Sequence, residues 1–290
     1  MKGKTVVITG ATSGIGEVAA IELARRGARI AFVARSPFRA DALIPRLTTV
    51  NPGAAHAVYH ADLSRLSEMK RIAGQIAATE PRIDVLINNA GAMFARREAT
   101  ADGLEMTFAT NHLAYFVVTN LLLERLKATP GARIVSTASG AHKSGKLNFD
   151  DLQSEKSYAG FRVYGTSKLC NILFTRELAR RLDGSGVTAN CLHPGFVATH
   201  FGDNNDGLLG FGVGVVKKLA AITPEEGAKT IVYLASSPEV AGKSGGYFYK
   251  CAPVTPNVAA QNDADAKRLW DVSVKITGVE GAVKARAEPS

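Results

Sequence analysis

The sequence predicts an α/β fold in which one doubly wound parallel sheet carries helices on both faces. Short β-branched runs alternate with longer alanine-rich stretches of helical spacing, which is the pattern of successive βαβ units. The composition, 46% hydrophobic and 21% charged, is that of an ordinary globular chain. Because no linker, internal repeat or low-complexity block interrupts the pattern, we expect residues 1–290 to form a single domain.

Five β-branched runs predict the first strands of the sheet. Between them apolar residues recur at intervals of three and four, as in Ile15, Ala19 and Leu23, which is the spacing of one buried helix face. The strands are expected at Thr5–Thr9, Arg29–Ala34, Ala57–Ala61, Val85–Asn88 and Arg133–Thr137.

The second half of the chain predicts longer helices. Glycines follow two of them, and Thr223-Pro224 with two glutamates behind it is a strong start signal for a third. The expected elements are helices over Leu104–Lys127 and Phe161–Leu182, a strand at Thr188–Leu192, the helix from Thr223, a strand at Gly246–Tyr249 and a surface helix at Asp263–Ile276. We expect residues 200–222 to form a glycine-rich loop and 278–290 to form a C-terminal tail.

The charge balance and the cysteines narrow the class of protein. The 35 Lys and Arg against 26 Asp and Glu give a net charge of +9, which suits nucleic acid, an anionic membrane or a phosphate-bearing ligand. Scattered basic residues argue against nucleic acid, and no apolar run reaches the ~18–20 residues of a membrane span. Cys170, Cys191 and Cys251 are too far apart in sequence for a disulfide framework or a metal site, so we interpret them as buried packing residues of a soluble, cytoplasmic, metal-free chain.

A glycine-rich turn predicts a nucleotide site. The run Thr9-Gly10-Ala11-Thr12-Ser13-Gly14-Ile15-Gly16 joins the first strand to the first helix, where unpaired backbone N–H groups can receive a pyrophosphate. Its spacing is G-x3-G-x-G and not the GxGxxG fingerprint, so a plain strand-to-helix turn is the alternative. With the alternating elements, it favours a Rossmann-type sheet.

An arginine stands where an NAD site usually has an acid. Arg35 lies 19 residues beyond Gly16, and the stretch Leu23–Ala40 contains no Asp or Glu but also carries Arg39. Guanidinium groups suit a 2′-phosphate, so we expect NADP(H) in preference to NAD(H). We interpret the other arginines of this stretch, Arg25, Arg26 and Arg29, as solvated surface.

Polar residues follow the third and fourth strands. Asp62 is placed to accept from an adenine amine, and the turn Asn88-Asn89-Ala90-Gly91 is placed to lie against ribose. The alternative for either segment is an ordinary helix cap or turn.

A tyrosine and a lysine four residues apart predict the reaction chemistry. Tyr164 and Lys168 lie on one face of the expected helix. A phenol that works near neutrality needs its pKa lowered by about 3 units, roughly 4 kcal/mol, and one charge at about 4 Å supplies that much at an effective dielectric constant of ~20. Ser139 follows the fifth strand, where it would hold a substrate carbonyl, and a kink at Asn111 would suit a proton relay. An ordinary i,i+4 side-chain pair on the helix surface is the alternative for the tyrosine and lysine.

Taken together, the motifs resemble the short-chain dehydrogenase/reductase family, in its retinol-dehydrogenase-like branch. They are TGATSGIG, ADL, NNAG, Asn111, Ser139, YGTSK and the HPG of His193-Pro194-Gly195, and they cover about Lys4–Tyr249. The resemblance implies a catalytic tetrad of Asn111, Ser139, Tyr164 and Lys168. It implies cofactor contacts at Gly10, Thr12, Ser13, Gly14, Ile15, Gly16, Arg35, Arg39, Asp62, Leu63, Asn89, Ala90, Gly91, Tyr164, Lys168, Pro194, Gly195, Val197 and Thr199.

We therefore expect an NADP(H)-dependent oxidoreductase that transfers hydride between the nicotinamide and an apolar aldehyde, ketone or secondary alcohol. Residues 4–200 would hold the cofactor and catalytic core, and the loop 200–222 would act as a substrate lid. The alternative is a non-catalytic NADP(H)-binding sensor or interaction protein on the same fold. The resemblance also implies a homodimer or homotetramer formed through the helices that hold Asn111 and Tyr164. The membrane anchor of some members of the branch is not expected, because Lys4 almost begins the first strand.

Overall fold

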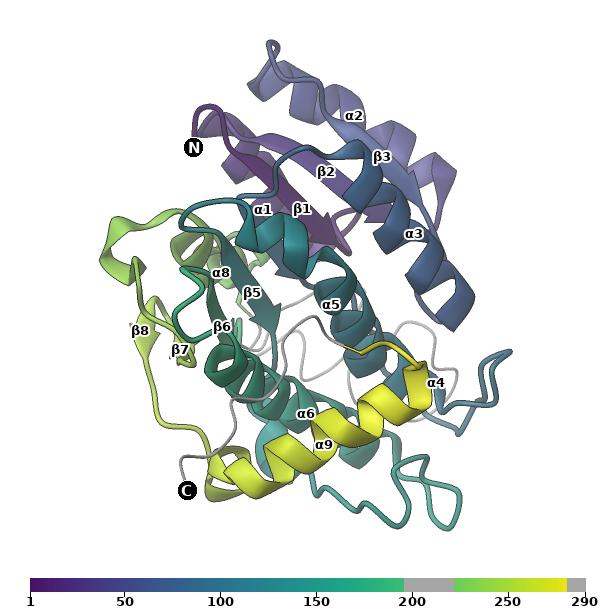
Figure 1. Ribbon diagram of the computed structural model, residues 1–290. Helices are drawn as coiled ribbons and strands as arrows, with labels where there is room; N and C mark the ends of the chain where they lie inside the picture. The colour runs from purple at the N-terminus through teal and green to yellow at the C-terminus, as the bar shows by residue number, and fades with distance from the viewer. Residues whose placement is uncertain (196–221, 281–290) are drawn as a thin grey trace.

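A computed structural model describes residues 1–195 and 222–280, which are built around one eight-stranded sheet (Figure 1). The strand order is β3-β2-β1-β4-β5-β6-β7-β8, with β1 to β7 parallel and β8 antiparallel to β7. The strands are β1 Thr5–Thr9, β2 Arg29–Ala34, β3 Ala57–His60, β4 Val85–Asn88, β5 Arg133–Thr137, β6 Thr188–Leu192, β7 Tyr247–Tyr249 and β8 Ala252–Pro253. The predicted doubly wound α/β fold is confirmed, the third strand ends one residue early, and β8 was not predicted.

Helices cover both faces of the sheet, as the alternating pattern predicts. One apolar core lies between the sheet and α1, α2 and α8, and a second lies between the sheet and α3, α5 and α6 (Figure 1). These helices are α1 Gly14–Arg25, α2 Pro37–Val50, α3 Leu66–Thr79, α5 Ala114–Lys127, α6 Gly160–Arg181 and α8 Pro224–Ser236. Consecutive residues of β1 show why both faces are filled, because Val6 and Ile8 pack in one core and Val7 packs in the other.

The chain changes direction beside β1. After β1 it runs outward to β2 and β3, and it then returns to place β4 on the other side of β1. In an open α/β sheet such a switch point leaves a crevice outside the carboxyl ends of the strands. The predicted site residues that follow β1, β4 and β5 therefore gather at one edge.

The predicted helix over 104–127 is broken. Its first turn, α4 (Met106–Phe108), passes into a π-helical turn at Ala109–Leu113, and only then does α5 begin. The side chain of Glu105 starts α4 by accepting the N–H groups of Thr107 (2.8 Å) and Phe108 (2.6 Å). Asn111 lies inside the π-helical turn, which is the kind of kink that the sequence required for its role.

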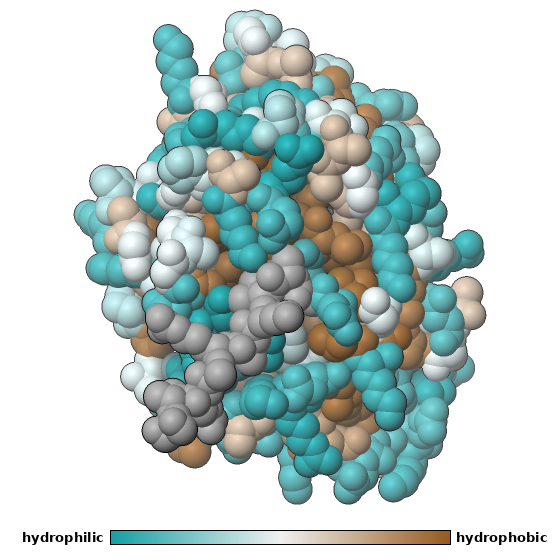
Figure 2. Space-filling view, viewed as in Figure 1, coloured by the Kyte–Doolittle hydropathy of each residue, from teal (hydrophilic) through white to brown (hydrophobic). Residues whose placement is uncertain are grey.

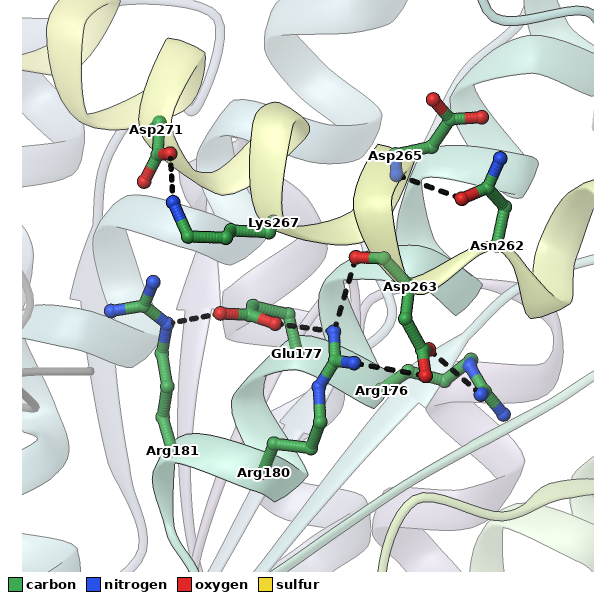
Figure 3. A network of polar contacts seen from close by, with 9 residues as sticks. All are labelled: Arg176, Glu177, Arg180, Arg181, Asn262, Asp263, Asp265, Lys267 and Asp271. Carbon is green, nitrogen blue, oxygen red and sulfur yellow. Dashed lines mark hydrogen bonds and ion pairs between the residues drawn. The ribbon is translucent and has the colours of Figure 1, made fainter. Parts of the chain in front are cut away.

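The last helix, α9 (Asp263–Thr277), is the predicted surface helix, with one face exposed at Lys267, Asp271 and Lys275 and the opposite face buried. Its face at Ala266, Leu269, Trp270 and Ser273 is buried against α5 and α6. The Trp270 ring stacks on Phe174 at 5.8 Å between centroids and 15° between planes. At the start of α9, Asp263 forms ion pairs with Arg176 and Arg180 of α6 (Figure 3). These partners are far away in sequence, so the helix pattern alone did not identify them.

Two expectations about single residues are wrong. Cys170 and Cys191 are buried as predicted, but Cys251 is partly exposed in a turn with φ +61°. Arg29 is not simply solvated, because its guanidinium forms a two-pronged ion pair with the buried carboxylate of Glu80. In the part of the chain that the structure describes, none of the helices combines the length and apolar character needed to span a bilayer.

Candidate active site

A threonine side chain joins the carboxyl ends of β1 and β4. Thr9 Oγ1 accepts the backbone N–H groups of Asn89 (3.0 Å) and Ala90 (3.1 Å). In return, Asn89 Nδ2 donates to the carbonyl of Gly10 (3.0 Å). The glycine-rich turn and the turn after β4, both predicted to bind the cofactor, therefore lie side by side.

The glycines of the first turn are required by close backbone contacts. A Cβ at Gly16 would lie 2.1 Å from the Gly10 carbonyl oxygen and 2.4 Å from Asn89 Nδ2. Gly10 itself has φ +69°, and a Cβ there would lie 2.7 Å from the Cα of Ala90. The spacing G-x3-G-x-G thus reflects the packing of α1 against the two turns.

The N-terminus of α1 is left without a side-chain cap. Ser36, Thr223 and Asn262 cap α2, α8 and α9 with their side chains, whereas Ser13 makes no such bond at the start of α1. The first N–H groups of α1 thus remain available to an anion. The residues predicted to surround the pyrophosphate line this helix end: Thr12, Ser13, Gly14, Ile15 and Gly16.

The residues predicted for the adenosine end follow β2 and β3. Arg35 is the residue after β2 and Arg39 lies in the first turn of α2, and both side chains are exposed. Asp62 accepts the Ser64 N–H (3.1 Å) and hydroxyl (2.8 Å) with Oδ1. The side chain of Leu63 packs in the apolar core, so only its backbone faces the crevice side of this turn.

Ser139, Tyr164 and Lys168 come together at the end of β5. The Tyr164 hydroxyl is hydrogen-bonded to the Ser139 side chain. Lys168 Nζ donates to the Thr137 carbonyl (3.1 Å) and lies 5.6 Å from the centroid of the Tyr164 ring. Both Tyr164 and Lys168 are buried, at 9% and 3% exposed, so the alternative of an ordinary side-chain pair on the helix surface is excluded.

Asn111 is held by the turn that follows β4. Its Oδ1 accepts the Ala92 N–H (2.8 Å), and its Nδ2 donates to the Ala92 carbonyl and to Ser167 Oγ (2.9 Å each). A Cβ on Gly91 would lie 3.2 Å from Asn111 Oδ1 and 3.3 Å from Lys168 Nζ. The side-chain amide of Asn111 therefore binds Ala92 and Ser167. The expected proton relay would then pass through the backbone of Asn111.

The HPG segment follows β6 at the same edge of the sheet. Gly195 has φ +95°, and its N–H donates to His193 Nδ1 (3.2 Å). Pro194 is partly exposed between them. The predicted contacts Val197 and Thr199 lie outside the described residues, as do residues 200–221 of the predicted lid 200–222.

Comparison with known proteins decides the family. The model of the family described as short chain dehydrogenase matches residues 4–207. The chain belongs to the short-chain dehydrogenase family. It is therefore a nicotinamide-dependent oxidoreductase that acts on CH–OH groups.

The relatives place this dehydrogenase in the retinol-dehydrogenase-like branch. It is 44% identical to human retinol dehydrogenase 14 over 96% of this chain and 88% of the relative, and 40% identical to human retinol dehydrogenase 13 over 99% and 88%. A crystal structure from Mycobacterium Paratuberculosis is 33% identical, with a TM-score of 0.78 over 97% of this chain and 96% of that one. A short chain dehydrogenase from Burkholderia cenocepacia in complex with NADP is 26% identical, with a TM-score of 0.67 over 85% and 96%.

The electrostatics of the dehydrogenase site differ from the prediction. Burial raises the pKa of Tyr164 to about 12, and the hydrogen bond with Ser139 only partly opposes this. Burial also lowers the pKa of Lys168 to about 7. The predicted lowering of the phenol pKa by the lysine charge is therefore wrong for this chain, because the desolvated ammonium loses its charge near neutrality and donates to Thr137.

Sequence reasoning missed the threonines at the strand ends. Thr137 Oγ1 donates to Asn89 Oδ1 (3.2 Å), and its carbonyl receives Lys168. Thr9 and Thr137 each end an apolar strand, and this position was the available signal.

Proposed function

We propose that the chain transfers hydride between NADP(H) and the carbonyl or alcohol carbon of an apolar substrate, and that Asn111, Ser139, Tyr164 and Lys168 form its catalytic group. The observation that carries the proposal is the convergence of Ser139, Tyr164 and Lys168 beside Gly91 at the switch point of the sheet. It pairs a buried acid with a buried base where a nicotinamide cofactor is expected.

The residues present fit a dinucleotide. The uncapped N-terminus of α1 would bind the pyrophosphate, and the close contacts at Gly10 and Gly16 keep that turn narrow. The carboxylate of Asp62 would accept from the adenine amine. The ribose would lie against Asn89, Ala90 and Gly91. Lys168 would hold the nicotinamide ribose, and Pro194, Gly195, Val197 and Thr199 would hold the carboxamide.

Two exposed arginines support NADP(H) over NAD(H). Among the described residues, neither Arg35 nor Arg39 has a carboxylate partner, so both are available to a 2′-phosphate. The NADP complex of the Burkholderia relative is consistent with this choice.

We expect Arg35→Ser with Arg39→Ser to lower the ratio of kcat/KM for NADPH to that for NADH by about tenfold or more. Arg25→Ser, in the same stretch but paired with Glu22, should leave the ratio unchanged. An unchanged ratio in the double variant would contradict the NADP(H) assignment.

The chain's own groups supply the proton chemistry. A bound nicotinamide supplies the hydride for reduction and takes it up in oxidation. Tyr164, protonated at neutral pH, donates its proton to the carbonyl oxygen that Ser139 polarises. Lys168, with a pKa of about 7, then returns a proton toward Tyr164 at physiological pH. The backbone of Asn111 continues the relay.

Tyr164→Phe tests the enzymatic proposal. We expect turnover to be abolished while NADPH still binds, because the phenol supplies the proton and not the cofactor pocket. Tyr233→Phe is the matched control, since that phenol lies on α8 and bonds Glu239. Normal turnover by Tyr164→Phe would overturn the assignment of the acid. A wild-type chain that binds NADPH but reduces no aldehyde or ketone would favour the alternative, a non-catalytic sensor.

The apolar substrate class draws on two observations. The relatives at 38–44% identity are named retinol dehydrogenases, enzymes of an apolar alcohol. Phe161 lies one helical turn before Tyr164 on α6 and is 60% exposed. A panel of aldehydes and ketones of increasing chain length, read as loss of NADPH absorbance, tests the class. Equal kcat/KM for short polar and long apolar carbonyls would contradict it.

The expected homodimer or homotetramer is proposed with a constraint from α9. Trp270 covers Phe116 and Phe174, so a second copy has no access to that part of α5 and α6. Apolar surface is still visible over α5 between α3 and α9 (Figure 2), and Leu121 of α5 is 37% exposed. We infer that two copies pair through this remaining strip. Sedimentation of the Leu121→Glu variant as a monomer, against an oligomeric wild type, would support the pairing, whereas an unchanged oligomer would exclude it.

A further inference from the structure

His142 is a buried histidine that neither the family comparison nor the proposed function accounts for. It lies in the 3-10 turn Gly140–Ser144 directly after Ser139 and is 1% exposed. Its Nδ1 is 2.8 Å from the carbonyl oxygen of Ser139. The ring packs edge-on against Tyr247 of β7, with 5.2 Å between centroids.

Two backbone groups determine which ring nitrogen of His142 carries the proton: the carbonyl of Ser139 at Nδ1 and the N–H of the distant Asn257 at Nε2. The Tyr247 hydroxyl, 3.3 Å from Nδ1, can either donate or accept and so fits the same arrangement. The N–H of Asn257 points at His142 Nε2 at 3.4 Å. A backbone N–H only donates, so Nε2 has to accept, and the single proton of the neutral ring lies on Nδ1. Nδ1 then donates to the Ser139 carbonyl. A second proton on the ring would face the Asn257 N–H, and burial also lowers the pKa of His142, so the ring stays neutral.

This arrangement fixes Ser139 through both its side chain and its backbone carbonyl. Ser139 Oγ accepts the Ala141 N–H (3.2 Å) and bonds the Tyr164 hydroxyl, while its carbonyl is held by His142. Rotation of the peptide after Ser139 would break the histidine bond and move the hydroxyl away from Tyr164. Asn257 lies beyond the residues 4–207 that match the family model.

We propose that His142, held in its Nδ1–H form by the Asn257 backbone, is a positioning residue that aligns Ser139 with Tyr164. The segment after β8 thereby controls the geometry of the catalytic serine. The inference rests on the proposed function only for its kinetic consequence, because the position of the proton on the ring is independent of any reaction.

A proline at position 257 removes the backbone donor that faces the ring. Asn257 has φ −62°, which is the value proline requires. Asn257→Pro loses the N–H and also the side-chain cap to the Ala260 N–H (3.3 Å), whereas Asn257→Ala loses the cap alone. The difference between the two variants therefore isolates the N–H.

The first readout is the 15N NMR spectrum of the imidazole nitrogens. We expect the wild type and Asn257→Ala to carry the His142 proton on Nδ1, and Asn257→Pro to show a mixture of the two tautomers. A wild-type proton on Nε2, or an unchanged Asn257→Pro spectrum, would overturn the assignment whether or not the chain turns over a substrate.

The second readout is kinetic. His142→Phe keeps a ring against Tyr247 but has no donor for Ser139, and His142→Asn keeps a donor at the Nδ1 position. We expect kcat to fall by about tenfold or more in His142→Phe and by less than about threefold in His142→Asn, with the Kd for NADPH unchanged in both.

Circular dichroism checks that each variant is folded. Equal kcat values in the two folded variants would overturn the positioning role. A wild-type chain without turnover would instead overturn the proposed function and leave the tautomer result standing.

Discussion

Replacing the buried Lys168 with methionine should stabilise the chain while removing its activity. Lys168 is 3% exposed, and burial lowers its pKa from 10.5 to about 7. Between these values the unfolded chain holds a proton that the folded chain has lost, so stability rises with pH across this window. Below pH 7 both states are charged, and the full desolvation penalty of the ammonium opposes folding.

The size of the effect follows from the displacement of the pKa. One pKa unit corresponds to about 1.4 kcal/mol, so the folded chain recovers roughly 5 kcal/mol over the whole window and about 2 kcal/mol between pH 7 and pH 9. Methionine has nearly the length of lysine and no charge. In Lys168→Met this pH-dependent gain disappears, while other groups that titrate in this range contribute equally to both proteins.

Urea unfolding at pH 7 and pH 9 measures the difference. The wild type should gain about 2 kcal/mol relative to Lys168→Met on going from pH 7 to pH 9. Lys275→Met is the control, since Lys275 is an exposed residue of α9 and its replacement should leave the pH dependence of the wild type. Parallel pH dependence of wild type and Lys168→Met would show that the pKa of this lysine is not depressed, and the reasoning would fail.

Three further substitutions test the frame around the site. Thr9→Val leaves two buried backbone N–H groups without an acceptor and should lower the free energy of unfolding by about 3 kcal/mol. Thr48→Val, at an exposed helix position, is its control, and equal losses in denaturant titrations would refute the role of Thr9. Trp270→Ala should cost about 3–5 kcal/mol by circular dichroism, and a loss below about 1 kcal/mol would show that α9 is not anchored by this ring. Gly16→Ala should weaken NADPH binding by about tenfold or more in calorimetry. Gly74→Ala, where a Cβ meets nothing within 4 Å, should not, and tight binding by Gly16→Ala would contradict the close packing of the turn.

The sequence identified the sheet because its strands are buried on both faces. Continuous β-branched runs such as Val6–Ile8 have few alternatives to a central parallel strand. The π-helical turn at Ala109–Leu113 escaped prediction, because one extra residue in a helical turn leaves the apolar pattern almost unchanged. The partners of the buried face of α9 were not predicted for another reason. Phe116 lies more than a hundred positions before Trp270, and Phe174 nearly a hundred, so no local pattern links them.

The sequence predicted which residues form the candidate site, but not the direction of their pKa shifts. Spacing along a helix tells that Tyr164 and Lys168 share a face, and strand ends tell that Ser139 and Gly91 lie at one edge. The direction of a pKa shift depends on how many atoms surround each group, which spacing does not contain. Burial of Lys168 therefore reversed the expected electrostatics.

The burial of Lys168 explains why the residues around it make so many hydrogen bonds. A buried lysine that destabilises the fold stays in place only if its surroundings cannot relax to let water in. Here the Thr137 carbonyl accepts from its Nζ. The amide of Asn111 makes two hydrogen bonds to the backbone of Ala92, next to Gly91, and a third to Ser167. These polar contacts help to offset the cost of keeping a lysine with a pKa of about 7. Removing those contacts should free the lysine to take up water, so that activity is lost and its pKa returns toward 10.5.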